Sequence, residues 1–160
     1  MTLPALVIGI GNLSRGDDAL GHCVLDALEA EALPDTTFEC LPVFQLQPEH
    51  ALDLVGRPGV LIVDAARADH APGVQLTRLQ PGRDASWTSH ALSPAALLQL
   101  CLDLHAGTPQ AVPPVWLLSV AGDRFELGEA LSAEAEARLV EAVDRARQWC
   151  RDVSASILAG

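Results

Sequence analysis

The feature that most constrains the fold is a set of short apolar runs. Residues 5–10 (ALVIGI), 60–63 (VLIV) and 115–120 (VWLLSV) are too short for helices and lack the alternation of a strand with one solvated face. Each is therefore predicted to be a strand buried on both faces. Between the runs, apolar residues recur at helical spacing, as in Leu20, Val24, Leu25 and Leu28. This alternation predicts a mainly parallel sheet covered by helices.

Weaker patterns complete the prediction. Residues 36–41 are expected to form another strand, and residues 74–79, between two Pro-Gly pairs, an additional strand at an edge. Helices are expected over residues 20–33, 48–55, 94–106 and 132–150, two of them starting at Ser93-Pro94 and Ser132. No repeat or linker is evident. We therefore expect a single three-layer α/β/α domain over residues 1–151, with a twisted, mainly parallel five-stranded sheet, and a flexible tail over residues 152–160.

Charge and composition exclude several classes of partner. The 160 residues carry 10 basic and 21 acidic side chains, for a net charge of -11, which argues against nucleic acid and anionic membranes. The first residues read as a strand and a glycine turn rather than a signal peptide, and no run approaches the roughly 18 apolar residues of a membrane span. The four scattered cysteines are typical of reduced thiols. A cytoplasmic protein, monomeric by default, is expected.

The segment IGIGNLSRGDDALG, residues 8–21, opens like a nucleotide-binding loop but closes on two aspartates. Ser14 stands where the dinucleotide fingerprint needs its last glycine, no Gly-Lys-Ser/Thr follows, and Asp17 and Asp18 would repel a phosphate. Capping of the next helix accounts for one of the two carboxylates. The other is free to point into the crevice beyond the strand ends, where ligands bind in α/β sheets. A cation suits this loop better than a phosphate.

A further carboxylate, Asp64, directly follows the apolar run 60–63. In a sheet of order 2-1-3 the first and third strands are neighbours, which would bring Asp64 beside the acidic loop. An aspartate after a buried strand is common, so its position alone leaves a functional and a structural role equally open.

Among the five histidines, His90 is favoured as a metal ligand because its segment, WTSHALSP, precedes a capped helix at a strand-to-helix junction. Together with two aspartates it would form a site with open coordination positions, typical of an exchangeable ligand. This chemistry does not choose among zinc, nickel, iron and manganese. Two other histidines are reserve ligands: His22, four residues after Asp18, and His70, in a surface loop. His50 and His105 are expected to be ordinary helix residues.

Three segments together resemble one family. GIGNLSRGDDALG after the first strand, VDAA after the third and the histidine in SHALSP are similar, in order and spacing, to the hydrogenase maturation proteases over nearly the whole chain. The resemblance implies a twisted sheet flanked by helices and an aspartyl-type endopeptidase that removes a C-terminal extension from the large-subunit precursor of a nickel-iron hydrogenase after nickel insertion. By motif position, Asp18, Asp64 and His90 would be the metal-contacting and catalytic residues, and Asp17 the helix cap. Many members have glutamate where Asp18 stands and glycine where Ala19 stands.

The resemblance also implies no permanent cofactor, because the recognised metal would be the nickel of the precursor. Residues 44–54 (FQLQPEHALDL) resemble a stretch of members that serve soluble, cofactor-linked hydrogenases. Two alternatives remain open: a metal-dependent hydrolase with its own metal, and a non-catalytic nickel-binding chaperone.

Overall fold

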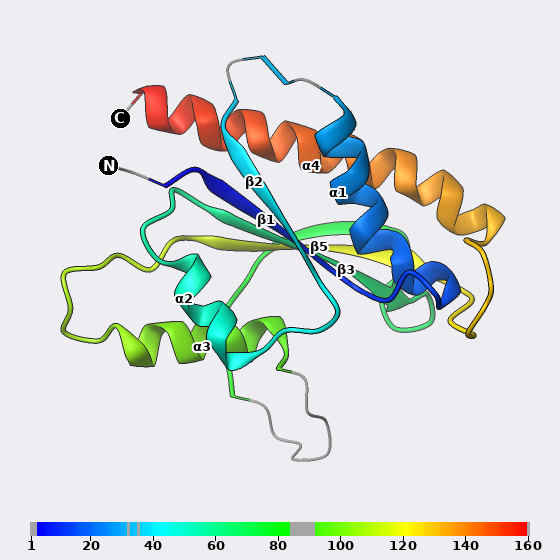
Figure 1. Ribbon diagram of the computed structural model, residues 1–160, viewed down its shortest axis with the longest axis horizontal. Helices are drawn as coiled ribbons and strands as arrows, with labels where there is room; N and C mark the ends of the chain where they lie inside the picture. The colour runs from blue at the N-terminus through cyan, green and yellow to red at the C-terminus, as the bar shows by residue number, and fades with distance from the viewer. Residues whose placement is uncertain (1–2, 32, 35, 84–91, 160) are drawn as a thin grey trace.

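Five strands form one twisted sheet in the order β2-β1-β3-β5-β4 (Figure 1). The computed structural model describes residues 3–31, 33, 34, 36–83 and 92–159. The pairs β2–β1, β1–β3 and β3–β5 are parallel, whereas β4 is antiparallel to β5 at the edge. These findings confirm the predicted sheet, including its edge strand. The strand bounds are β1 Ala5–Ile10, β2 Phe38–Val43, β3 Val60–Arg67, β4 Val74–Arg78 and β5 Val115–Gly122.

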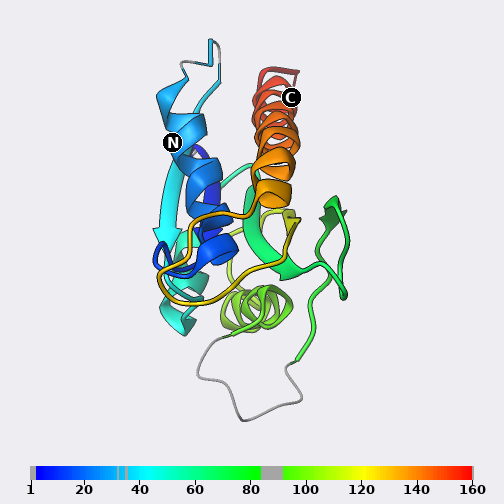
Figure 2. The same cartoon turned by 90° about the vertical axis from the view of Figure 1, so that its right-hand side faces the viewer.

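Helices cover both faces of the sheet (Figure 2). On one face lie α1 (Leu20–Ala30) and α4 (Ala133–Ala159), and on the other α2 (Ala51–Leu54) and α3 (Pro94–Leu104). Alternate strand residues divide between the two cores: Val7 packs with the α1 and α4 side, whereas Ile8 packs with the α2 and α3 side. The predicted three-layer α/β/α arrangement is therefore confirmed.

Hydroxyl caps begin two helices as the sequence predicts. Ser93 Oγ accepts a hydrogen bond from Ala96 N at 3.1 Å ahead of α3, and Ser132 Oγ accepts one from Ala135 N at 3.1 Å ahead of α4. The residues from 152, expected to be a flexible tail, instead continue α4 to Ala159. They are held because Val153 packs against the core and Ser154 is buried.

The sequence predicts neither a membrane-spanning helix nor a disulfide. None of the helices in the described part of the chain has the length and apolar character needed to cross a membrane. The four cysteines are free thiols, as predicted.

The start of α1 lies unusually close to the ends of β1 and β3. A Cβ atom on Gly21 would overlap the carbonyl oxygen of Ile10 and lie 2.8 Å from that of Val63, and one on Gly9 would lie 2.5 Å from Gly21 O. Only glycine permits this approach. As a result, the one-turn 3₁₀ helix η1 (Gly16–Ala19), which carries both aspartates and leads directly into α1, lies at the carboxyl end of the sheet.

Candidate active site

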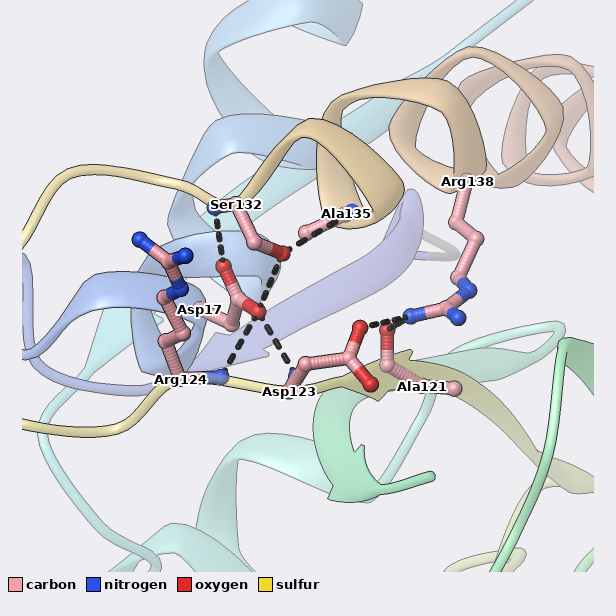
Figure 3. A network of polar contacts seen from close by, with 7 residues as sticks. All are labelled: Asp17, Ala121, Asp123, Arg124, Ser132, Ala135 and Arg138. Carbon is pink, nitrogen blue, oxygen red and sulfur yellow. Dashed lines mark hydrogen bonds and ion pairs between the residues drawn. The ribbon is translucent and has the colours of Figure 1, made fainter.

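The first aspartate of the loop, Asp17, is fully buried and binds the segment that joins β5 to α4 (Figure 3). Its Oδ2 accepts hydrogen bonds from Asp123 N at 2.7 Å, Arg124 N at 3.1 Å and Ser132 Oγ at 2.7 Å, and its Oδ1 accepts one from Ser132 N at 2.7 Å. Arg138 of α4 holds the same segment, since its Nη1 lies 2.7 Å from Asp123 Oδ2. The acidic loop is thereby fixed to a segment more than 100 residues away in the sequence.

This arrangement corrects the predicted capping role of Asp17. The N-cap residue of α1 is Ala19, which has no side-chain cap, because the Asp17 carboxylate is fully engaged by the β5–α4 segment. Burial by itself raises the pKa of Asp17, but the hydrogen bonds from Asp123, Ser132 and Arg124 outweigh it and bring the pKa below the ordinary value of 3.8. Asp17 is thus an ionised structural anchor.

The second aspartate, Asp18, is half-buried and faces a different neighbour. Its Oδ2 accepts a hydrogen bond from Asn12 N at 2.9 Å. Gly11 makes this turn possible: its φ of 148° favours glycine, and a Cβ there would collide with the backbone oxygen of Asp18. The two consecutive carboxylates therefore have different partners: Asp17 binds the β5–α4 segment, and Asp18 binds the turn after β1.

Asp64 lies within β3 rather than at its end. The strand continues four residues beyond the predicted run to Arg67, pairing Asp64 with Ser119 of β5, whereas pairing with β1 stops at Val63. Asp64 is therefore level with Ile10, the last residue of β1, next to the point where the acidic loop begins. Burial, and secondly the charge of Asp18, raise the pKa of Asp64 to about 7. The charge of Asp18 therefore acts on Asp64, in agreement with the neighbouring positions of β1 and β3 in the sheet.

The histidines are less informative. His90 lies outside the described residues, so its assignment as the third ligand stays a prediction. His22 Nε2 donates a hydrogen bond to Val43 O at 2.9 Å and joins α1 to the end of β2. His70 is exposed beside Asp69, with Nε2 3.9 Å from Oδ2. Across residues 3–83 and 92–159, leaving aside the undescribed positions 32 and 35, no group of three histidine, cysteine or acidic side chains is placed to hold a metal.

Comparison with known proteins adds to this geometry. No protein-family model and no curated protein matches the sequence. The fold matches the hydrogenase-maturating endopeptidase HybD from E. coli with a TM-score of 0.69 and 24% identity, covering 94% of this chain and 93% of the other. It also matches the [NiFe] hydrogenase maturation protease HycI from Thermococcus kodakarensis, with a TM-score of 0.65, 18% identity and 92% of each chain covered. The chain has the fold of the hydrogenase maturation endopeptidases.

A further relative in structure is the hydrogenase 2 maturation peptidase from a Thaumarchaeota archaeon, with a TM-score of 0.61 and 22% identity over 91% of this chain and 96% of the other. The match to the maturation-endopeptidase fold thus spans nearly the whole of both chains in each case. The fold-level expectation drawn from the sequence motifs is confirmed.

Some residues of this region have no clear signal in the sequence. Ser132 is predictable as a helix cap, but its second bond, from Oγ to Asp17 Oδ2, is not, because it depends on the tertiary fold. Gly122 is similar: a Cβ there would lie 2.8 Å from Asp17 Cβ, so this position must stay small for the anchor to fit. Only a sequence signal that links the acidic loop to the β5–α4 segment could have identified the roles of Ser132 and Gly122.

A large cavity on this protein lies away from the candidate site. A cavity of about 740 Å³ lies between the C-terminal half of α4 and the β4–β5 edge, with Trp116 and Trp149 in its wall. It lies at the end of the sheet where β3 and β5 begin, whereas Asp64 is level with the last residue of β1 and Asp18 lies in η1 beyond it. None of the residues that line it is a predicted site residue. The carboxylate pair, rather than the size of this cavity, defines the candidate site.

Proposed function

We propose that this protein is an endopeptidase that removes the C-terminal extension of a nickel-iron hydrogenase large-subunit precursor after nickel insertion. The observation that carries the proposal is that the charge of Asp18, in η1 beyond the carboxyl end of β1, acts on the half-buried Asp64 of the neighbouring strand β3, in the region where α/β folds bind ligands. A fold hosts many functions, so the fold shared with hydrogenase maturation endopeptidases supports the proposal only together with this site.

The electrostatics of the pair favour a cationic ligand. Asp64 is desolvated and lies close enough to Asp18 for the two charges to repel, so a cation between them would supply the missing attractive partner. In our proposal this cation is nickel that the precursor carries, contacted by Asp18, Asp64 and His90, and the protein needs no permanent cofactor. A precursor without nickel would offer these carboxylates nothing to bind, which explains why cleavage would follow insertion.

The protein partner follows from the same proposal. The substrate would be a large-subunit precursor, and residues 44–54 favour one from a soluble, cofactor-linked hydrogenase in the cytoplasm. Asp17 takes no part in contacting the metal, since both of its oxygens already accept hydrogen bonds from the β5–α4 segment.

Cleavage of the nickel-loaded precursor by matched variants tests the proposal. Asp18→Asn, Asp64→Asn and His90→Ala should each abolish processing while circular dichroism stays that of the folded protein. Asp69→Asn is the control, because Asp69 is an exposed aspartate outside the pair, and it should cleave at the wild-type rate. Wild-type cleavage by Asp64→Asn would contradict the proposal.

Two further outcomes would support the alternatives. Stoichiometric zinc in protein purified without added metal would favour a hydrolase with its own metal. Binding of the precursor without any change in its length would favour a nickel chaperone.

A further inference from the structure

Three large apolar side chains are exposed on separate loops at the carboxyl end of the sheet. They are Leu13 after β1, Phe44 after β2 and Leu127 after β5, exposed by 64%, 67% and 69%. A single exposed apolar residue needs no explanation. Three on loops at the same end of the sheet are informative if the fold holds those loops together.

Backbone hydrogen bonds do join the three loops. Gly11 N donates to Val43 O at 3.0 Å, which connects the loop of Leu13 to the residue before Phe44. Gly128 N donates to Ser14 O at 2.7 Å, which connects that loop to the residue after Leu127. In Figure 2 the segment leading to α4 runs alongside η1, as these bonds require. The fold therefore holds the three loops next to one another.

The central loop of this set also positions the carboxylate pair. Leu13 directly follows Asn12, whose backbone N–H binds Asp18 Oδ2 at 2.9 Å. The loops that present Leu13, Phe44 and Leu127 to solvent are therefore joined by hydrogen bonds to the loop that holds Asp18.

We propose that Leu13, Phe44 and Leu127 form an apolar rim that docks the substrate chain around its bound cation. This rests on the proposed function and names the chemistry of the docked segment: apolar side chains near the cation and no acidic residues. Apolar partners gain from burial against the rim, whereas acidic ones are repelled by Asp18, Asp64 and a chain of net charge -11.

Charge also decides between the precursor and a second copy of this chain as the occupant. Two copies meeting rim to rim would bring two acidic centres, each in a protein of net charge -11, against one another. Like charges across an interface oppose association. A cation-bearing precursor segment satisfies both the apolar rim and its acidic centre.

The test is steady-state cleavage of nickel-loaded precursor by the triple variant Leu13→Ser/Phe44→Ser/Leu127→Ser. The matched control is Leu104→Ser/Val140→Ser, which replaces apolar side chains of comparable exposure, 53% and 66%, on α3 and α4. We expect the KM of the triple variant to rise about tenfold or more, with kcat within about twofold of wild type, and no change in the control. A wild-type KM in the triple variant, or an equal rise in the control, would contradict the proposal that the apolar rim docks the substrate.

Direct binding separates failure of the rim from failure of the proposed function. The Kd of the nickel-loaded precursor should rise by the same factor in the triple variant, whether or not cleavage occurs. If the wild-type protein binds the precursor without cutting it and the triple variant binds weakly, the proposed protease activity is contradicted. The role of the rim in docking the precursor is then still supported. Sedimentation of the protein alone gives the remaining outcome: a dimer that the triple variant dissolves would assign the rim to a second copy and overturn our proposal.

Discussion

Replacement of Asp17 should reveal how strongly the acidic loop is anchored. Its carboxylate accepts four hydrogen bonds at 2.7 to 3.1 Å from Asp123, Arg124 and Ser132, entirely out of solvent. A hydrogen bond to a charged group contributes about 1.5–3 kcal/mol, and a buried donor left without a partner costs about 1–3 kcal/mol. Even at the lower value, four such bonds amount to about 6 kcal/mol, comparable to the whole stability of a small domain at about 5–15 kcal/mol.

The asparagine variant should be milder for a geometric reason. An amide oxygen in place of Oδ2 keeps three of the four acceptor contacts, whereas the amide N–H₂ in place of Oδ1 faces the N–H of Ser132. We therefore expect Asp17→Asn to lower the free energy of unfolding by about 2–3 kcal/mol. Asp17→Ala should lower it by about 6 kcal/mol or prevent folding altogether.

Urea unfolding followed by circular dichroism at neutral pH measures both changes. Asp26→Asn is the control, because Asp26 is an exposed aspartate on α1, and it should lie within about 0.5 kcal/mol of wild type. A loss below about 1 kcal/mol for Asp17→Ala would refute the anchoring role assigned to the four hydrogen bonds.

Three further predictions concern the same region. Because the pKa of Asp64 rises from 3.8 to about 7 on folding, the folded state holds more protons than the unfolded state in that window, so the stabilisation present below pH 3.8 is lost as pH rises to about 7. Melting temperatures at pH 5.5 and 8 should fall with pH more steeply in wild type than in Asp64→Asn, and parallel profiles would contradict the raised pKa. Gly21→Ala should lower the free energy of unfolding by about 1–3 kcal/mol or more, since its Cβ meets backbone atoms. In the control Gly82→Ala, the Cβ meets only Ala95 Cβ at 3.7 Å, and an equal loss there would argue against the close approach of α1. Ser132→Ala should cost about 1–2 kcal/mol, and a double-mutant cycle with Asp17→Asn should show coupling, whereas strict additivity would deny the bond between them.

Local sequence patterns predict most of the fold. Continuous apolar runs identify β1, the first half of β3 and β5 because strands buried on both faces need no polar alternation. The second half of β3 was missed because residues 64–67 carry no apolar run and are held by their pairing with β5, as in Asp64 with Ser119. The end of α4 was missed for a similar reason, since tertiary contacts of Val153 and Ser154 hold it.

The sequence likewise predicts one part of the candidate site and not another. Strand order alone predicts that Asp18 and Asp64 meet, because neighbouring parallel strands end at the same edge of the sheet. The role of Asp17 could not be predicted, since its partners lie 106 to 115 residues further along the chain. Its position before a helix suggested a cap, and only the tertiary structure shows it bound to the β5–α4 segment.

The most direct test of the central proposal is the intact mass of the large-subunit precursor after incubation with this protein. Nickel-loaded and nickel-free precursor from the same cell would be treated in parallel. The account predicts loss of a C-terminal peptide from the nickel-loaded precursor and an unchanged mass for the nickel-free one. Unchanged mass in both samples would contradict the protease, and equal cleavage of both would contradict recognition of nickel through Asp18 and Asp64.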